Sequence, residues 1–321
     1  MKRLILLVLG CIGLLPQASD AQQLPLFTQY RENISVINPA AVSHDYLVYE
    51  NNVSYGASYR RQWVGLDSGP RTQTVRGEYI FTELGSFGLA AGLYLMNDKT
   101  GPTGFTGIYG RLAGIITDGD PYYGGLSIGL AFGAVQYRVN VTDIKLRDPG
   151  DIVGMDDQAQ IYPDAGLGIY YYKLISDGFL EDSHIYGGLS VPQIIGLNLE
   201  FEDETGNFYT QRVQHFYGTV GLYKYLDEGF IEPSIWVKYA PNVPLNIDFN
   251  LRYQLAGNFW IGAGGSTSGA MHLEGGLLMG ENMGFDNTLK IGYGFGYSFT
   301  TFGPSAGTTH EINLSYSLST Y

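Results

Sequence analysis

The sequence has little charge, almost no cysteine and no long internal apolar run. Charged residues make up 15% of the 321 residues, against about 25% in ordinary globular proteins. The single cysteine, Cys11, excludes a framework of internal disulfides. Past the N-terminal leader, no apolar stretch is long enough for a membrane-spanning helix. Positive charge is also scarce, and the net charge of −13 argues against a nucleic-acid partner.

Glycine and aromatic residues are instead abundant, with 45 Gly, 26 Tyr and 16 Phe. A charge-poor chain without spanning helices suits a transmembrane β-barrel, in which the apolar residues alternate along the strands. Aromatic residues then form the girdles at the membrane interfaces, and glycine fits turns and crowded inward positions. A soluble β-protein rich in Gly and Tyr is the alternative, but such a protein would not need so few charges.

The clearest strand is the stretch from Leu289 to Phe299, which reads LKIGYGFGYSF. Its odd-numbered positions are all Leu, Ile, Tyr or Phe, and its even-numbered positions are Lys, Gly or Ser. Because side chains alternate between the two faces of a strand, one face is apolar and the other small or polar. A length of about ten residues is what a tilted strand needs to cross a bilayer.

Alternating segments of this kind recur along the chain and predict an all-β, antiparallel outer-membrane barrel of about fourteen strands. The expected strands are residues 46–63, 71–83, 86–97, 104–117, 122–140, 160–174, 184–192, 211–226, 229–240, 244–255, 257–266, 269–280, 287–299 and 308–319. If both chain ends are periplasmic, the two longest connections, 141–160 and 192–210, fall outside the cell. Most connections on the other side are short, which is typical of outer-membrane barrels.

The chain divides into a leader, an arm and a barrel. Residues 1–21 have the basic start, the apolar run and the small-residue cleavage site of a secretory signal peptide, with cleavage near Ala21. Cys11 invites a lipoprotein interpretation, but the apolar run continues past it, so cleavage there would fall inside that run. Residues 22–45 are neither alternating nor helical, and predict an N-terminal periplasmic arm that packs on, or enters, one end of the barrel. Residues 46–321 form the barrel, and the location is the outer membrane.

Several motifs in a fixed order carry a resemblance to a known family. They are the N-terminal LPLFTQY followed by Asn38-Pro39-Ala40, the stretch from Tyr59 to Leu66 (YRRQWVGL), the stretch from Asn97 to Thr103 (NDKTGPT), RDPGD at 147–151 and YGGLSVP at 186–192. With these motifs, essentially the whole mature chain resembles the PorP/SprF family of outer-membrane proteins, which is associated with type IX secretion and gliding motility. The acidic segment 200–206 departs from the family pattern.

The resemblance implies a non-enzymatic accessory component that docks the secretion machinery or assists export and anchoring of large secreted surface proteins. Its expected partners are outer-membrane lipid and that machinery or cargo. The motifs of the arm and loops supply the candidate partner-binding residues, which are Asn38, Pro39, Asn97, Asp98, Asp148 and Asp151. Turn stabilisation is an equally good explanation for residues of these types.

No constellation in the sequence predicts catalysis, a cofactor or a metal. The five histidines are scattered without metal-ligand spacing, and no nucleophile elbow occurs. Asp148, Asp151, Asp156 and Asp157 share one long loop, but their spacing is not that of a calcium-binding loop, and a solvated acidic loop is favoured. The glycines at 292, 294 and 296 resemble a nucleotide-binding motif, but no helix follows them to bind a phosphate. They are better explained as small inward residues of a strand, which leave lumen space or room for a plug or the arm. Trp63, Trp236 and Trp260 are expected at strand ends, as interface girdle residues.

Two functions of different class remain open. A secretion partner predicts a filled or narrow lumen, whereas a porin or a channel for hydrophobic substrates predicts an open lumen lined by charge or a continuous apolar cavity. The strongest alternating strand places Gly and Ser inward rather than rings of charge, which favours the secretion partner.

Overall fold

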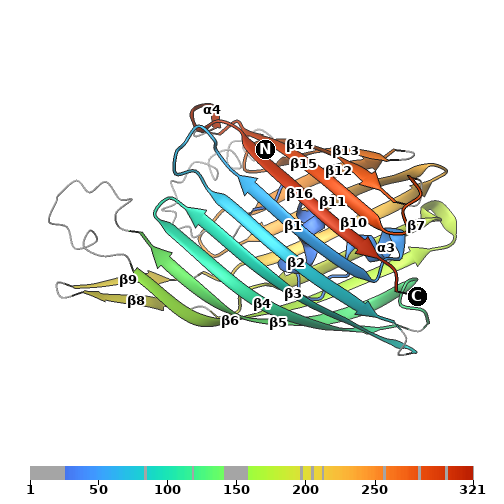
Figure 1. Cartoon of the computed structure of the whole chain (residues 1–321), viewed down its shortest axis with the longest axis horizontal. Helices are drawn as coiled ribbons and strands as arrows, with labels where there is room; N and C mark the ends of the chain where they lie inside the picture. Colours follow the sequence, from blue (N-terminus) through green and yellow to red (C-terminus); the bar gives the residue numbers. More distant parts are fainter. Residues whose placement is uncertain are drawn as a thin grey trace, which may run out of the picture.

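The computed structural model describes residues 26–82, 85–117, 119–140, 158–195, 198–203, 206–211, 213–255, 258–280, 283–300 and 303–320. Within these residues the chain is one closed antiparallel barrel (Figure 1). None of the helices in this part of the chain has both the length and the apolarity needed to cross a membrane.

Fourteen strands form the barrel wall, and the first strand pairs with the last to close it. The strands are β1 (Val53–Arg61), β2 (Arg71–Phe81), β3 (Phe87–Thr100), β4 (Thr103–Ile116), β5 (Gly124–Val139), β6 (Gln158–Ile175), β7 (Ser183–Val191), β10 (Phe216–Leu226), β11 (Gly229–Tyr239), β12 (Asn246–Gln254), β13 (Phe259–Ser266), β14 (Ala270–Met279), β15 (Thr288–Ser298) and β16 (Thr309–Leu318). The predicted barrel of fourteen strands is therefore confirmed.

The alternation along the strands sorts the side chains as a membrane barrel requires. Along β15, Ile291 and Tyr293 are exposed on the outer face, while Lys290 is buried on the inner face. The same holds for β4, where Leu112 is 59% exposed and Arg111 is 2% exposed. An apolar outer face and a polar inner face match a wall between lipid and lumen.

The two ends of the barrel differ. The end that holds the connections 82–86, 117–123, 176–182, 227–228, 255–258 and 280–287 is called here the short-turn end, and it also holds the C-terminus (Figure 1, right). The opposite end, called the long-loop end, holds the connections 140–157 and 192–215, which are the longest. The second of these contains a hairpin outside the barrel wall, β8 (Asn198–Asp203) with β9 (Gly206–Gln211), which the sequence did not predict. Two short elements, η4 (Gly178–Leu180) and α4 (Gly303–Ala306), lie in connections at opposite ends.

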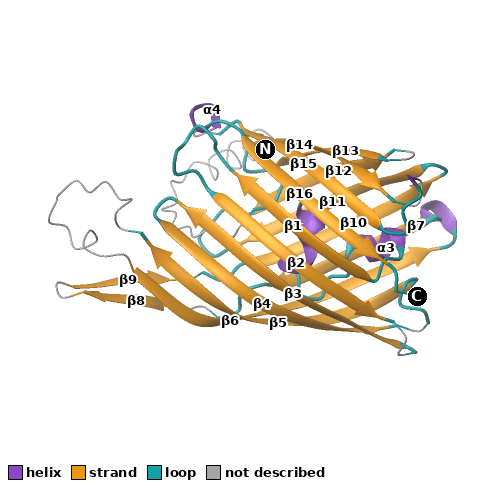
Figure 2. Cartoon of the chain, in the orientation of Figure 1, coloured by secondary structure: helices purple, strands orange, loops and turns teal. Residues whose placement is uncertain are grey.

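The N-terminal segment lies inside the barrel. Three short helices, η1 (Tyr30–Asn33), α2 (Ile34–Ile37) and α3 (His44–Tyr49), are enclosed by the strands (Figure 2). The sequence left open whether this segment packs on the barrel or enters it, and its described residues enter it. The first strand begins at Val53 rather than at residue 46, because residues 44–49 form α3.

Candidate functional site: the plugged lumen

Residues 26–52 fill the lumen and are called here the plug. Nearly all of them are buried, including polar and charged side chains that a free arm would expose; Asn33 is 0% exposed, Arg31 3% and Glu32 4%. Burying unpaired charge is costly, so such groups need partners inside the barrel. The wall supplies these partners from almost every side.

A group of hydrogen bonds to Glu311, called here the clasp, joins the start of the plug to the last strand. The backbone N–H groups of Thr28 and Gln29 donate to the carboxylate of Glu311 at 2.6 and 3.0 Å. Arg60 of β1 approaches the same carboxylate, with Nε 3.7 Å from Oε2. Glu311 lies near the long-loop end of β16 and is 0% exposed. The plug therefore begins its path through the lumen near the long-loop end.

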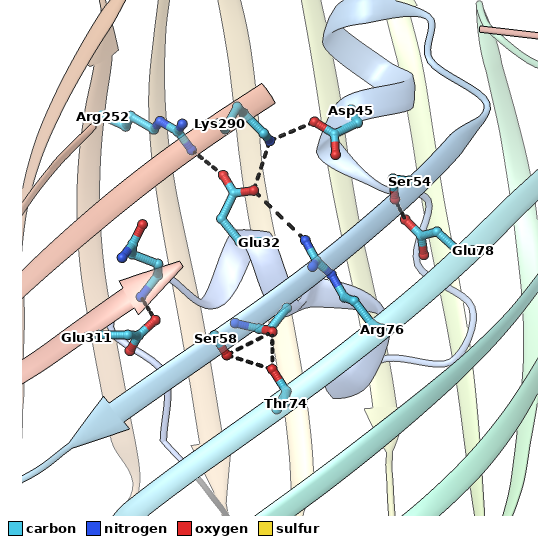
Figure 3. A network of polar contacts seen from close by, with 12 residues as sticks. Glu32, Asp45, Ser54, Ser58, Thr74, Arg76, Glu78, Arg252, Lys290 and Glu311 are labelled. Atoms are coloured by element: carbon cyan, nitrogen blue, oxygen red, sulfur yellow. Dashed lines mark hydrogen bonds and ion pairs between the residues drawn. The ribbon is translucent and has the colours of Figure 1, made fainter. Parts of the chain in front are cut away.

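The centre of the plug is an ionic cluster around Glu32 (Figure 3). Its carboxylate accepts from Arg252 of β12 at 3.0 Å and from Lys290 of β15 at 2.8 Å, and Arg76 of β2 lies 4.0 Å away. Lys290 also contacts Asp45 of α3 at 2.6 Å, so it links two parts of the plug. Three cations from three strands thus converge on one plug carboxylate, which fixes its position from opposite sides of the wall.

At Arg31 the signs of the charges are exchanged: the plug supplies the cation and the wall supplies the carboxylates. Its guanidinium lies 3.1 Å from Glu232 of β11 and in close contact with Glu274 of β14. The adjacent Tyr30 donates its hydroxyl to Ser234 at 2.7 Å and stacks on Trp236, with ring centroids 5.1 Å apart. Charges of both signs on the plug are therefore matched by opposite charges on the wall.

The Asn38-Pro39-Ala40 motif forms a turn pressed against the far wall. The Asn38 side-chain amide donates to the carbonyl of Ile169 at 3.1 Å, and its oxygen accepts from the Ala40 N–H at 2.9 Å. Arg111 of β4 donates to the carbonyl of Pro39 at 3.0 Å and pairs with Glu78 of β2 at 2.6 Å. In the structure this motif attaches the middle of the plug to β4 and β6 through hydrogen bonds.

Inward glycines make room for that turn. A Cβ on Gly129 of β5 would lie 2.5 Å from the carbonyl oxygen of Pro39 and 2.6 Å from Cα of Ala40. A Cβ on Gly168 of β6 would approach the side-chain oxygen of Asn38 even more closely. For the glycines at 292, 294 and 296 the sequence left two alternatives open, lumen space or room for a plug or the arm. A Cβ on Gly294 would lie 2.9 Å from Cγ2 of the plug residue Thr28, and one on Gly292 would approach the side-chain oxygen of Gln29, so the plug takes up the room at these two positions as well.

The short-turn end of the plug is helix α3. The carbonyl of Leu47 accepts from the Tyr225 hydroxyl at 2.9 Å, and Tyr46 packs edge-on against Tyr122, with centroids 6.1 Å apart. Burial and the neighbouring Glu50 carboxylate raise the pKa of Tyr122 to about 12, so its hydroxyl stays protonated at neutral pH. Two cavities of about 580 Å³ each open beside α3 at this end.

The predicted partner-binding residues do not form one site. Asn38 and Pro39 are buried in the plug, whereas Asn97 and Asp98 lie on opposite faces of β3. Asn97 is exposed and donates to Thr106 at 2.7 Å, and Asp98 is buried and accepts from Thr72 at 2.5 Å. Their role as partner contacts stays a prediction. Asp148 and Asp151, and the calcium question raised by their loop, lie outside the described residues.

One expectation about side-chain placement is wrong. Trp236 and Trp260 are 0% and 2% exposed and face the lumen, so they are not interface girdle residues. Trp236 is covered by the plug residue Tyr30, and the Arg252 guanidinium lies 3.9 Å from the Trp260 ring centroid. Charged side chains such as Arg252 and Lys290 are also present on the inner wall, where Glu32 of the plug carries the matching charge. Trp63 follows the end of β1, as expected.

The charged cluster attaches the plug to the barrel wall. Among the described residues, no group of three or more His, Cys, Asp or Glu side chains is arranged to hold a metal ion. The carboxylates that attach the plug, those of Glu32, Glu232, Glu274 and Glu311, are engaged by arginine, lysine or backbone N–H groups. This arrangement holds the plug across the lumen of the barrel.

Known structures with a similar fold are outer-membrane barrels. The toluene transporter TbuX of Ralstonia pickettii is 11% identical, with 89% of this chain and 93% of that chain covered and a TM-score of 0.50. A FadL homologue of Pseudomonas aeruginosa is 8% identical, with 84% and 89% covered and a TM-score of 0.49. At such low identity, the likeness shows the fold alone. No curated protein matches the chain in sequence.

Sequence comparison with protein families gives a match over nearly the whole chain. Residues 19–316 match the family described as type IX secretion system membrane protein PorP/SprF, as the motifs from Asn38 to Pro192 suggested. This range includes the plug and all fourteen barrel strands, apart from the last residues of β16. The chain belongs to the PorP/SprF family of type IX secretion system membrane proteins.

Proposed function

We propose that this protein is a plugged, non-enzymatic barrel of the outer membrane, which docks machinery or a large secreted protein of the type IX system rather than conducting solutes. The observation that carries the proposal is the ionic attachment of the plug. Glu32 lies close to basic side chains of β2, β12 and β15, and Arg31 contacts carboxylates of β11 and β14. The Asn38 turn is hydrogen-bonded to β6. A channel that admits solutes freely has no use for a plug fixed in this way.

The apolar cavity beside Phe27, Val36 and Ile37 of the plug supports the same conclusion. An apolar cavity between plug and wall, lined by Phe27, Met96 and Tyr217 among others, has a volume of about 20 Å³. Pockets for small ligands usually have volumes of about 300–1,000 Å³. The cavity is therefore far too small for a hydrophobic substrate. The alternative, a porin or hydrophobic-substrate channel, requires the plug to leave or rearrange.

We infer the orientation from the connections. Outer-membrane barrels keep short turns in the periplasm and long loops outside the cell. The short-turn end, with α3 and the C-terminus, then faces the periplasmic machinery. The long-loop end faces the cell surface, where large secreted proteins are anchored. This orientation gives each end of the barrel a different class of partner.

Two measurements test the proposal. Purified protein in planar bilayers is expected to show no steady conductance, and a strain lacking the gene is expected to lose one or more large proteins from the cell surface or medium. Loss of a few proteins indicates a dedicated partner, and loss of the whole type IX set indicates a core component. Steady conductance together with an unchanged set of secreted proteins would refute the proposal and favour the channel.

A further inference from the structure

A row of basic side chains crosses the outer face of the barrel at its long-loop end. Strand pairing puts Arg61 of β1 directly opposite Arg71 of β2, and Arg71 directly opposite Lys99 of β3. Arg71 and Lys99 are exposed and Arg61 is half-buried, and all three alternate with inward-facing residues, so they lie on the outer face. The same row continues to Arg138 of β5 on one side and to His310 of β16 on the other. Strands β16 and β1 to β5 are consecutive in the wall (Figure 1).

The wall strands place no carboxylate beside these cations. Within the described residues, the Asp and Glu side chains of the fourteen strands all lie on the inner face, and they are Glu78, Asp98, Asp164, Glu232, Asp248, Glu274 and Glu311. Asp67, in the turn that joins β1 to β2, is exposed and forms no ion pair with Arg61 or Arg71 in the described chain. The outer face at this end is therefore positively charged.

Arg61 and Arg71 face each other at short range. The N–H of Gln62 donates to the carbonyl of Pro70 at 2.8 Å, so residues 62 and 70 form the hydrogen-bonded pair next to them. Arg61 and Arg71 are then a non-hydrogen-bonded pair, in which Cα atoms lie about 4.5 Å apart and the side chains are closer. Like charges directly opposite each other on neighbouring strands are destabilising. Two guanidinium groups in this arrangement suit an oxyanion with more than one charge, since arginine forms paired hydrogen bonds with phosphate.

Polar and then apolar residues follow the basic row toward the middle of the wall. The next row on the outer face of β1 to β5 consists of hydrogen-bonding side chains, Tyr59, Gln73, Asn97, Thr106 and Gln136. The row after that is apolar and consists of Ala57, Val75, Leu95, Ile108 and Ala134. A phosphorylated lipid has the same order of groups, from the charged phosphate through the polar part of the headgroup to the acyl chains. The three rows therefore match the depth profile of such a lipid.

The basic row is confined to one side of the barrel. On the opposite side, at the same end, the outward residues of β10, β11, β12, β14 and β15 are uncharged, namely Phe216, Tyr239, Ile247, Met271 and Tyr297. At the short-turn end the outward cations Lys173 and Lys224 are not opposite each other, because each faces a different, uncharged residue of β7. A general attraction to anionic membranes does not require cations in adjacent register on one side. The clustering indicates a defined site.

We propose that Arg61 and Arg71 bind a phosphate group of an anionic lipid in the leaflet at the long-loop end, with its acyl chains against Val75 and Leu95. In the orientation inferred above this is the outer leaflet, so the ligand is a phosphorylated lipid of the cell surface. The inference goes beyond the proposed function and rests on it only for the choice of leaflet. It also gives Asn97, one of the predicted partner-binding residues, a position beside the lipid headgroup.

The test uses the full mature chain, purified in detergent, and two lipid probes. One probe is diphosphoryl lipid A, a phosphorylated glycolipid, and the other is the same lipid after enzymatic removal of its phosphates. Native mass spectrometry is expected to show tighter binding of the phosphorylated form. R61Q/R71Q is expected to weaken this binding about tenfold to thirtyfold, since each basic residue near lipid phosphates contributes about fivefold. R61K/R71K keeps both charges and should lose less.

Lys173→Gln is the matched control, because Lys173 is an exposed cation on the outer face at the short-turn end. It should bind the phosphorylated lipid as the parent does. Equal binding of the two lipids, or equal losses for K173Q and R61Q/R71Q, would overturn the proposal. Displacement of the lipid by an equal concentration of an acidic peptide, Gly-Ser-Glu-Leu-Glu-Ser-Gly, would overturn it in favour of a protein ligand. Displacement by inorganic phosphate at that concentration would overturn it in favour of free phosphate.

A second measurement examines the barrel as it leaves the membrane. Protein extracted from cells with mild detergent is expected to carry phosphorylated lipid, and the phosphorus content per barrel should fall in R61Q/R71Q but not in K173Q. An unchanged phosphorus content in R61Q/R71Q would overturn the lipid site. Such a result would leave the proposed function intact if the lumen stayed closed and the secreted proteins still depended on this gene. Failure of the proposed function would conversely leave lipid binding by the parent unchanged.

Discussion

Replacing Glu32 with glutamine should release the plug. The substitution keeps the shape of the side chain but removes the charge that Arg252 and Lys290 contact at 3.0 and 2.8 Å. Asp45 would then be the only carboxylate of this cluster facing the cations, and it contacts only Lys290. Nε and Nη2 of Arg252 have no hydrogen bond of their own in the described structure, so the buried guanidinium would lose its compensation.

The size of the effect follows from this uncompensated charge. Breaking a buried ion pair by removing one partner costs about 3–5 kcal/mol, which raises the population with a displaced plug about 10²- to 10⁴-fold. Glu32→Gln should therefore show channel openings in planar bilayers that the parent does not show. Glu50→Gln is the control, because Glu50 is exposed at the end of the same segment.

A chemical probe reports the plug directly. Ser35 lies in α2 and is 4% exposed, so a Ser35→Cys variant should resist a large maleimide in the parent background and react in the Glu32→Gln background. Cys11, in the predicted leader, would not interfere in the mature chain. A closed lumen and an unreactive thiol at position 35 in the Glu32→Gln protein would refute the idea that this cluster holds the plug.

Three further predictions concern the wall. Gly129→Val should displace the Pro39 turn and lower the free energy of unfolding by about 1–3 kcal/mol, which a lower unfolding temperature and new conductance would reveal. Gly110→Val is the control and should match the parent, because a Cβ there would meet nothing within 4 Å. In variants with a single tryptophan, Trp236 should escape quenching by brominated lipid, whereas a Phe259→Trp reporter on the outer face should be quenched; strong quenching of Trp236 would contradict its place in the lumen. Leu112→Arg should destabilise the barrel in bilayers by about 2–4 kcal/mol in urea titrations, and an unchanged midpoint would mean that this face does not contact lipid.

The wall of the barrel could be predicted from the sequence because its signal is local. Each strand shows its own alternation within about ten residues, so the boundaries of β15 and β16 agree with prediction to within a residue or two. The first strand was extended too far, since residues 46–49 continue a helix that alternation alone did not reveal. Membership of the family followed from ordered motifs, which are also read directly from the chain.

The plug could not be predicted in the same way, because its partners lie far away in sequence. Glu32 and Lys290 are 258 residues apart, and Thr28 and Glu311 are 283 apart. No periodicity links such positions, and each charge taken alone resembles a solvated residue. The burial of Trp236 was missed for the same reason, since Tyr30, which stacks on it, comes from the other end of the chain. The one available signal was the row of inward glycines, which indicated room without identifying its occupant.

The clasp at Glu311 has a consequence for the assembly of this protein. The N-terminal segment is synthesised first, but the carboxylate that holds its beginning belongs to the last strand, which also closes the barrel by pairing with β1. Sealing the wall and anchoring the plug are therefore completed by the same final strand. A chain that stopped before β16 would lack both, so a truncated product would be left with an open seam between β1 and β15 and with the beginning of the plug unanchored.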